Sequence, residues 1–596
     1  MLARAVRVSG LAALALVGCT GRIGGGGAGA TVSAAGTNGG VATGGGGAAV
    51  ASTGAAGTGG TVGVVSSGLC TSAAMAAPPP AVRIRRLTRA EIQNTVIDLL
   101  GTNAGPLAAG LEADSQALGY STGDQRGVSA AYVGGLKRMA EGLGALFRPT
   151  VAAPSFDAGC FATDAAARAC AEKFVRDFGA RAFRRPLDDR EATALLGVYD
   201  VGVPTGTDGD VTDRMRSGLD YTVRAIFQSP HFIFRTELGP TTAPAAAATT
   251  LTPYELASAL SYGTIASPPD AMLTAAAAAD QLKTPDQIGA QVRRLIAARP
   301  DRFKAMVGEF AVEWLGINFD KPAWVKDTKA YPTFTSTLKS AFAQETQAYL
   351  SDWVDGGSSL PALLTSTNGF VNRDNAAVYG LKSTSATFQK TALPSGQRAG
   401  ILTQPAFLGS AAHTDGSSPV YRGLAVMSQL LCKSAPPVPA MVPPLPVVDK
   451  TMIKTTRQRY EVHETAAFCS ACHSTFDPMG YTFESYDGLG QWRTMENGVA
   501  VDPSGAIVGT QSSNAPMANA VALAGALAAS PEVHECFARQ VFRYDVGRVE
   551  TDADGCSIAQ ATAAYSAKNL DLRELLVALV TSPAFAARTA TPPGGP

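Results

Sequence analysis

The segment Cys469-Ser470-Ala471-Cys472-His473 is the part of the chain whose residue types and spacing most directly indicate chemistry. Cys-x-x-Cys-His is the attachment pattern of c-type haem, in which two thiols add to the haem vinyl groups and the adjacent imidazole binds the iron. Positions three and four apart share one face of a helix, so Cys469, Cys472 and His473 can all point at one macrocycle. The pattern predicts one covalent haem c with His473 as iron ligand. A redox cysteine pair, half of a zinc site and a structural disulfide are the alternatives.

The second axial ligand of such an iron would decide its chemistry. A filled position favours electron transfer, whereas an open one permits oxygen or peroxide chemistry. His463, ten residues before His473, is the first candidate, and a hydrogen bond to a haem propionate is its alternative role. His413 is a weaker candidate. Met479 is weaker still, because Asp477-Pro478-Met479-Gly480 is typical of a turn. An open site and the remaining methionines complete the set: Met441, Met452 and Met495.

Charged residues around the motif suggest supporting roles. Arg422 and Arg493 are candidates for pairing with the haem propionates, because a guanidinium group matches a carboxylate in shape and charge. A helix-end or surface arginine is the simpler alternative for each. Glu484 and Asp487 could form a carboxylate pair for acid–base work, but capping of a turn near Gly488 is the more economical interpretation. The sequence identifies no catalytic residue.

The first residues predict export. Arg4 and Arg7 form a basic start, a short apolar stretch follows from Leu11 to Val17, and Leu16-Val17-Gly18-Cys19 resembles a bacterial lipobox. Cys19 would then become the lipidated first residue, and the mature protein would be an outer-membrane lipoprotein that is periplasmic or exposed at the cell surface. A cleaved secretory signal is the competing interpretation. The apolar stretch is shorter than the roughly 20 residues that span a bilayer.

Composition separates a tether from a folded body. From Gly21 to about Pro80 the chain is mostly Gly, Ala, Thr and Ser, which predicts a flexible tether that buries too little apolar surface to fold. The body that follows is too long for one core. Lys and Arg total 49 against 49 Asp and Glu, and no basic stripe is present, so nucleic acid is not an expected partner. The membrane is expected to be contacted through the lipid alone.

In the oxidising compartment that the export signal predicts, the remaining cysteines are expected to form disulfides. Removing Cys19, Cys469 and Cys472 leaves six of the nine cysteines. Pairing of Cys160 with Cys170, and of Cys536 with Cys556, is plausible from their proximity along the chain. Cys70 and Cys432 then remain, although sequence alone does not fix the connectivity.

Apolar periodicity predicts a mainly α-helical, multidomain fold. Thr88 with Glu91, and Thr252 with Glu255, form capping boxes at two helix starts, and Gly101 supplies a stop for the first helix. Helical spacing continues through much of the body, in residues 165–183, 214–227, 288–298, 303–315, 338–353, 535–546 and 572–580. The expected divisions are a signal peptide 1–18, a linker 19–80, helical domains 81–150, 151–240 and 241–395, a haem-binding segment 396–505 and a C-terminal helical domain 506–596.

Two further patterns concern connections. The proline-rich run from Ala435 to Val448 excludes helix and predicts an extended linker ahead of the haem motif. The start at Leu87-Thr88 is echoed at Leu251-Thr252, and Ser229–Arg235 is echoed at Ser582–Arg588. These echoes predict equivalent helix ends, but two short matches do not establish a repeat.

The order of motifs resembles that of large secreted multidomain proteins of planctomycetes and myxobacteria, which combine consecutive domains of unknown function with a single cytochrome-c-type motif. The resemblance covers about residues 83–590. It is carried by Arg85–Glu91 with Leu99-Leu100-Gly101, Phe178–Leu187, Gln228–Glu237, Leu251–Leu260, Ser417–Gly423, the segment from Cys469 to Arg493, and Phe542–Arg548. The family also places a His at the position of His463. The resemblance implies architecture and haem, and it gives no substrate.

This chain departs from the family after Leu251–Leu260, where Ala259 and Gly263-Thr264-Ile265 stand in place of an Arg and an aromatic pair. The working hypothesis is an exported, lipid-anchored haem c protein that transfers single electrons to a redox partner protein. One alternative is a haem-dependent oxidase or peroxidase, or an accessory subunit in polymer breakdown. The other is a binding or scaffold protein with structural cysteines.

Overall fold

The computed structural model describes residues 70, 77–101, 104–122, 127–147, 156–205, 209–240, 242–244, 247–434, 454–465 and 467–590, without the side chains at 462, 463, 465, 467 and 468. The predicted signal peptide, Cys19, most of the predicted tether, the Ala435–Val448 run and the side chain of His463 lie outside this description. Helices dominate what is described, so the mainly α-helical prediction is confirmed. None of the described helices combines the length and apolar composition needed to cross a bilayer.

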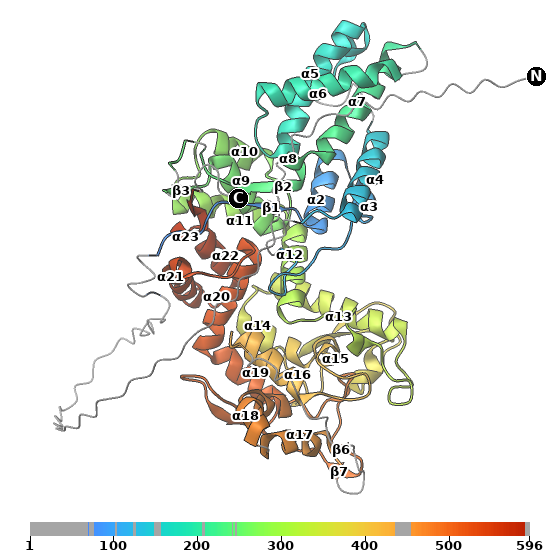
Figure 1. Cartoon of the computed structure of the whole chain (residues 1–596). Helices are drawn as coiled ribbons and strands as arrows, with labels where there is room; N and C mark the ends of the chain where they lie inside the picture. The colour runs from blue at the N-terminus through green and yellow to red at the C-terminus, as the bar shows by residue number, and fades with distance from the viewer. Residues whose placement is uncertain are drawn as a thin grey trace, which may run out of the picture. The chain divides into compact units, whose positions relative to one another are not determined.

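The helices follow one another with short connections (Figure 1). Their bounds are α2 Arg89–Leu100, α3 Gly105–Ala108, α4 Ala130–Leu146, α5 Asp164–Phe183, α6 Asp189–Gly202, α7 Val211–Gln228, α8 Pro230–Ile233, α9 Pro253–Ile265, α10 Ala271–Ala278, α11 Pro285–Ala298, α12 Pro300–Trp314, α13 Ser336–Asp355, α14 Leu360–Thr365, α15 Pro405–Ser410, α16 Pro419–Ala425, α17 Thr456–Thr465, α18 Ala467–Tyr481, α19 Ala520–Ala529, α20 Pro531–Val546, α21 Gly555–Ser566, α22 Leu572–Val580 and α23 Pro583–Ala586. A π-helical turn, η7, covers Val426–Leu430.

Strands occur as short antiparallel pairs, β1–β2, β3–β10, β4–β5, β6–β7 and β8–β9. Their bounds are β1 Arg83–Arg86, β2 Phe234–Glu237, β3 Ala248–Thr250, β4 Asn368–Val371, β5 Gln389–Ala392, β6 Met495–Glu496, β7 Val499–Ala500, β8 Gly505–Ile507, β9 Ala515–Met517 and β10 Ala587–Thr589. Two of the pairs join strands that lie far apart in the sequence: β1 pairs with β2, and β3 pairs with β10.

The predicted helix starts are confirmed. Thr88 and Glu91 exchange the two hydrogen bonds of a capping box at α2, and Thr252 and Glu255 do the same at α9. Gly101 ends α2 with a φ of 94°, a conformation that a residue with a side chain rarely adopts. Local side-chain chemistry therefore fixes where both helices begin.

The sequence echoes mark equivalent positions in two strand pairs. The amide of Leu87 donates to the carbonyl of Ile233 at 2.8 Å, and that of Leu251 donates to the carbonyl of Ala586 at 3.0 Å. In each case the donor stands directly before a capping-box threonine. Each acceptor lies two residues before the arginine of the Ser-Pro motif, Arg235 or Arg588. The helix-end equivalence predicted from the sequence is confirmed.

Two large clusters of buried apolar side chains hold the described helices together. One draws on residues 87–233 and includes side chains of α2 and α4–α8, together with Tyr262 of α9. The other draws on Tyr120 and on residues 251–585, from α9 to α23. The segment that carries the cysteine motif belongs to the second cluster through Phe476, Met479 and Phe483.

The departure at Gly263 has a packing explanation. A Cβ atom at this position would lie 1.8 Å from Oδ1 of Asp545, which extends from α20. Burial raises the pKa of Asp545 to about 6, although the charges of Arg85 and Arg235 oppose that shift. A larger residue at 263 is therefore excluded while Asp545 keeps this position.

Three disulfides join six of the eight described cysteines. Cys160 pairs with Cys170 as predicted. The predicted pairing of Cys536 with Cys556 is wrong, because Cys536 bonds to Cys432 and Cys556 bonds to Cys70. The reason is tertiary: α20 packs against η7, which places Cys536 beside Cys432 with a Cα–Cα distance of 5.4 Å. Asp157 also lies near Cys160 and Cys170, but sulfurs joined in a disulfide do not supply thiolate ligands to a metal.

Buried carboxyl groups predict that stability falls as pH rises. Burial raises the pKa of Glu345 to about 7, despite hydrogen bonds from Tyr379 and Asn375; burial and nearby Glu313 raise that of Glu309 to about 7. A folded-state pKa above the unfolded value of 4.5 stabilises the fold at low pH. We expect that stability to be lost between pH 4.5 and 7, by up to about 3 kcal/mol per group.

Denaturant unfolding at pH 5 and 7.5 measures this effect. Glu345→Gln should reduce the difference between the two pH values, because the glutamine does not ionise. Glu172→Gln is the matched control, since its side chain is 46% exposed on α5. An equal pH difference in the parent protein and in Glu345→Gln would contradict the prediction.

Candidate functional site

The cysteine motif lies on α18, which packs closely against α16 and α17 (Figure 1). Two glycines permit the close approach of α16 and α18. A Cβ at Gly423 would lie 2.0 Å from the carbonyl oxygen of Phe476, and one at Gly480 would lie 1.9 Å from that of Pro419. The backbones of the two helices therefore touch directly, and this contact fixes the position of the C-terminal half of α18.

Helix α18 continues further than the sequence suggested. The segment from Asp477 to Gly480, which the sequence analysis interprets as a turn, lies inside the helix, and Pro478 is an internal position. Proline lacks the N–H that would bond back to Ser474 and normally disrupts a helix. Here the helix persists because Phe476, Met479 and Gly480 are buried against the core and α16. The turn interpretation is wrong.

Cys469 and Cys472 are the unbridged cysteines of the described part of the chain, and both are half-buried. The other described cysteines are consumed in disulfides. Because α18 is a regular helix through both positions, the two thiols and the His473 ring share one face. The local geometry is therefore the one that the spacing of the motif predicts.

His473 is oriented by a buried carboxylate. Its Nδ1 lies 2.7 Å from Oδ2 of Asp477, one helical turn later, and the Asp477 side chain is fully buried. An ionised carboxylate accepts hydrogen bonds and donates none, so a neutral imidazole in this contact would donate from Nδ1 and carry its ring lone pair on Nε2. Metal-bound histidines have this arrangement, with one ring nitrogen toward the metal and the other donating to a carboxylate or carbonyl.

The two candidate propionate partners are already engaged with protein groups. Arg422 is fully buried and donates to the carbonyls of Phe483 and Tyr486 at 2.9 and 2.8 Å, and to that of Asp487 at 2.6 Å. Arg493 donates to the Glu484 carboxylate at 2.9 Å. These contacts hold the segment after α18 in place, and a role toward a haem propionate stays a prediction for both arginines.

The two nearby carboxylates have separate surroundings. Asp487 accepts from the amides of Leu489 and Gln491 at 2.8 and 2.9 Å, which confirms the turn-capping interpretation. Glu484 is buried between Arg493 and Ser417. Burial raises the pKa of Glu484, while the charges of Arg493 and Arg422 oppose the shift. The contacts of these carboxylates explain local structure and assign no acid–base pair.

The candidates for the second axial position are described in part. His413 is half-buried, its Nε2 lies 2.9 Å from the Tyr460 hydroxyl on α17, and burial lowers its pKa. Met479 is fully buried in the core. His463 is a position of α17, but its side chain lies outside the described residues. Assignment of the second ligand to His463 or His413 stays a prediction.

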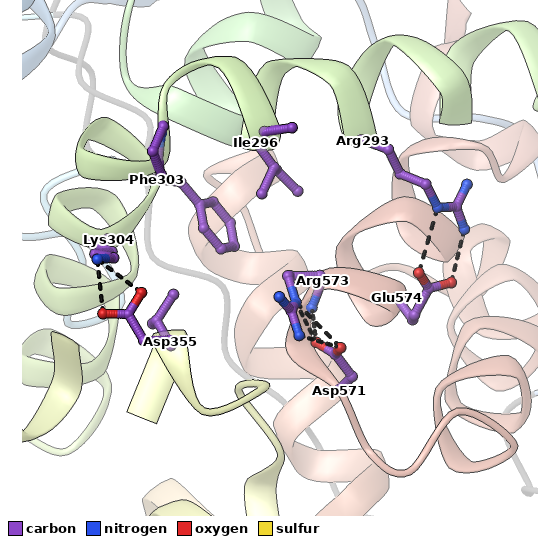
Figure 2. A pocket seen from close by; sticks show the side chains of 11 residues that line it. Arg293, Ile296, Phe303, Lys304, Asp355, Asp571, Arg573 and Glu574 are labelled. Atoms are coloured by element: carbon purple, nitrogen blue, oxygen red, sulfur yellow. Dashed lines mark hydrogen bonds and ion pairs between the residues drawn. The ribbon is translucent and has the colours of Figure 1, made fainter. Parts of the chain in front are cut away.

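A cavity of about 550 Å³ lies elsewhere, between α11, α12, the end of α13 and the start of α22. Figure 2 shows its apolar wall, which includes Ile296 and Phe303. Ion pairs rim it, with N–O distances between 2.7 and 2.8 Å: Arg293–Glu574, Lys304–Asp355 and Arg573–Asp571. Because these charges are mutually satisfied, the cavity does not present a charge pattern that selects a ligand.

The residues of α18 fit a covalently attached haem. They supply two thiols outside disulfides and an imidazole whose Nδ1 lies 2.7 Å from the Asp477 carboxylate. The sequence motif predicts these three residues but not Asp477, because the turn expected at Asp477–Gly480 places that residue outside the helix. The four-residue separation of His473 and Asp477 was the available signal, since such pairs are neighbours on a helix surface.

Five models of protein families match consecutive parts of the chain. Each is described as a protein of unknown function: DUF1587 at residues 85–147, DUF1595 at 170–237, DUF1592 at 251–381, DUF1588 at 398–496 and DUF1585 at 514–585. No curated protein and no solved structure matches the chain. The motif on α18 falls within the DUF1588 match. The chain therefore carries five consecutive domains of unknown function, in the order DUF1587, DUF1595, DUF1592, DUF1588 and DUF1585.

Proposed function

We propose that this protein carries one covalent haem c on α18 and transfers single electrons to a redox partner protein outside the cytoplasm. Cys469 and Cys472 would hold the haem as thioethers, and His473 would bind the iron. The haem would supply the reversible change between ferric and ferrous iron. The observation that carries the proposal is the combination of two unbridged thiols with an imidazole held by a buried carboxylate.

Two further features support this proposal. Three disulfides suit an oxidising compartment, which agrees with the export signal expected at the N-terminus. The contacts of Arg422 and Arg493 fix the segment that follows α18, so the motif is held on a rigid support. Anchoring to the outer membrane through a lipid on Cys19 belongs to the same proposal.

Covalent attachment predicts a visible spectrum that survives extraction. The full chain, produced with a c-type haem attachment system, should retain a Soret band after acid-acetone treatment. The Cys469→Ala/Cys472→Ala variant should lose all of it, because no thioether can form. Cys160→Ala/Cys170→Ala is the matched control: it also removes two cysteines, yet it should keep the band. A parent protein whose mass shows both motif sulfurs free or joined to each other would overturn the proposal.

The ligand at the second axial position separates a carrier from an enzyme. A carrier with a filled position should show little spectral change with carbon monoxide, cyanide or peroxide. In that case His463→Ala, or failing that His413→Ala, should create a binding position for carbon monoxide. Rapid spectral change of the parent protein with peroxide would instead favour oxidase or peroxidase chemistry.

A further inference from the structure

The side chain of Asp477 is the feature of α18 that the haem motif does not itself require. Its Oδ2 lies 2.7 Å from Nδ1 of His473, and the carboxylate has no exposed surface. A buried carboxylate is costly unless it is hydrogen-bonded or paired. Its place in the interior is fixed by the contact of α18 with α16, where Gly423 lies against the carbonyl of the preceding residue, Phe476. The backbone contact between α16 and α18 therefore fixes the position of Asp477.

We infer that Asp477 is the positioning residue of the proposed iron ligand, and that it biases a bound haem toward the ferric state. The first part concerns the imidazole alone: the carboxylate holds the proton on Nδ1, which leaves the ring lone pair on Nε2. The second part depends on the proposed haem, and it makes the protein a low-potential electron donor to its partner.

The electronic consequence follows from charge. A carboxylate that accepts the Nδ1–H bond increases the electron density that the imidazole donates through Nε2. A more strongly donating ligand and a nearby negative charge both stabilise ferric iron over ferrous iron, so the reduction potential falls.

Arg457 on α17 is a neighbouring cation that is engaged with other groups. Arg457 lies 2.7 Å from Glu461 and 3.3 Å from Asp502. Its guanidinium also stands over the ring of Tyr481, at 4.6 Å from the ring centre. These contacts engage Arg457 with Glu461, Asp502 and Tyr481, while Oδ2 of Asp477 lies 2.7 Å from Nδ1 of His473.

The potential of the haem-loaded chain tests the second part. Asp477→Asn keeps the shape of the side chain and removes its charge. We expect the ferric-to-ferrous equilibrium to shift at least tenfold toward ferrous iron, which corresponds to a potential about 59 mV more positive. Asp502→Asn is the control, since it removes a carboxylate whose side chain is 59% exposed, and its potential should match that of the parent. Asp477→Glu, which restores a carboxylate, should have a potential close to that of the parent.

The haem-free chain tests the first part independently. Long-range proton–nitrogen NMR of the His473 ring should show the proton on Nδ1 in the parent protein and a mixture of the two tautomers in Asp477→Ala. If haem attaches and the Asp477→Asn potential is unchanged, the inference is wrong and the proposed function stands. If no variant binds haem but the tautomer depends on Asp477, the positioning role stands and the proposed function fails. Equal tautomer populations in parent and Asp477→Ala overturn the positioning role.

Discussion

Replacing Glu237 with Gln is expected to destabilise the folded body by about 3–5 kcal/mol, the usual cost of removing one partner from a buried ion pair. The Glu237 side chain is 5% exposed and lies 2.7 Å from Nε of Arg83 and 2.5 Å from Nη2 of Arg588. The carboxylate therefore joins β2 to both β1 and β10. Without it, the buried guanidinium groups of Arg83 and Arg588 both lose the carboxylate with which they pair.

The pH dependence gives a second measurement of the same site. Burial alone would raise the pKa of Glu237, but the charges of Arg83 and Arg588 outweigh burial and hold the pKa far below its usual value. A lowered folded-state pKa means that the stabilisation is present above the unfolded value of 4.5 and is lost as the pH falls below it. Glu237→Gln should therefore lose stability at pH 7 and little at the lowest pH that the fold tolerates.

Guanidinium unfolding followed by circular dichroism provides the measurement. The control is Glu574→Gln, which removes a carboxylate paired with Arg293 at 2.7 Å at the surface, where side chains are 28% and 53% exposed. The loss of unfolding free energy in Glu574→Gln should stay below about 1 kcal/mol. Equal losses for the two variants would show that Glu237 does not hold the strand pairs together.

Replacing Arg422 with Met is expected to lower the free energy of unfolding by about 3–5 kcal/mol as well. The destabilised region would be the segment that carries the motif. Its guanidinium is fully buried and donates to backbone carbonyls of Phe483, Tyr486 and Asp487. Methionine fills much of the volume but removes these three buried hydrogen bonds, and Glu484, 3.8 Å from Nη1, loses a nearby positive charge.

Arg457→Met is the matched control for this substitution. Arg457 pairs with Glu461 and Asp502 at the surface of α17, and its side chain is 22% exposed. A loss below about 1 kcal/mol is expected there. Hydrogen exchange of the amides in residues 483–491 should accelerate in Arg422→Met and stay unchanged in Arg457→Met. Unaltered exchange in Arg422→Met would contradict the role that its hydrogen bonds assign to it.

Local sequence chemistry predicts much of this fold. The capping residues Thr88 and Thr252 and the stop at Gly101 gave correct helix ends, because these signals act within one helical turn. The repeated Ser-Pro motifs marked equivalent strands for the same reason. The Cys160–Cys170 bridge could also be predicted from the sequence, since it joins the two ends of one short segment.

The errors concern contacts that only the folded chain creates. Cys432 and Cys536 meet because α20 packs on η7, and no local pattern announces that pairing. The helix through Pro478 persists because the tertiary contact at Gly480 compensates for the low helix propensity of the proline. Likewise, Glu237 finds Arg83 and Arg588 at separations of 154 and 351 residues. Long-range burial, rather than propensity, decides each of these features.

The Cys432–Cys536 bond closes a covalent ring around the whole segment from α17 to α19. A protease that cleaves one peptide bond between residues 433 and 535 would nick the chain without releasing a fragment. The two pieces would migrate as one on a non-reducing gel and part only after treatment with dithiothreitol. Any group bound to α18 would therefore remain covalently linked to the rest of the molecule after such cleavage.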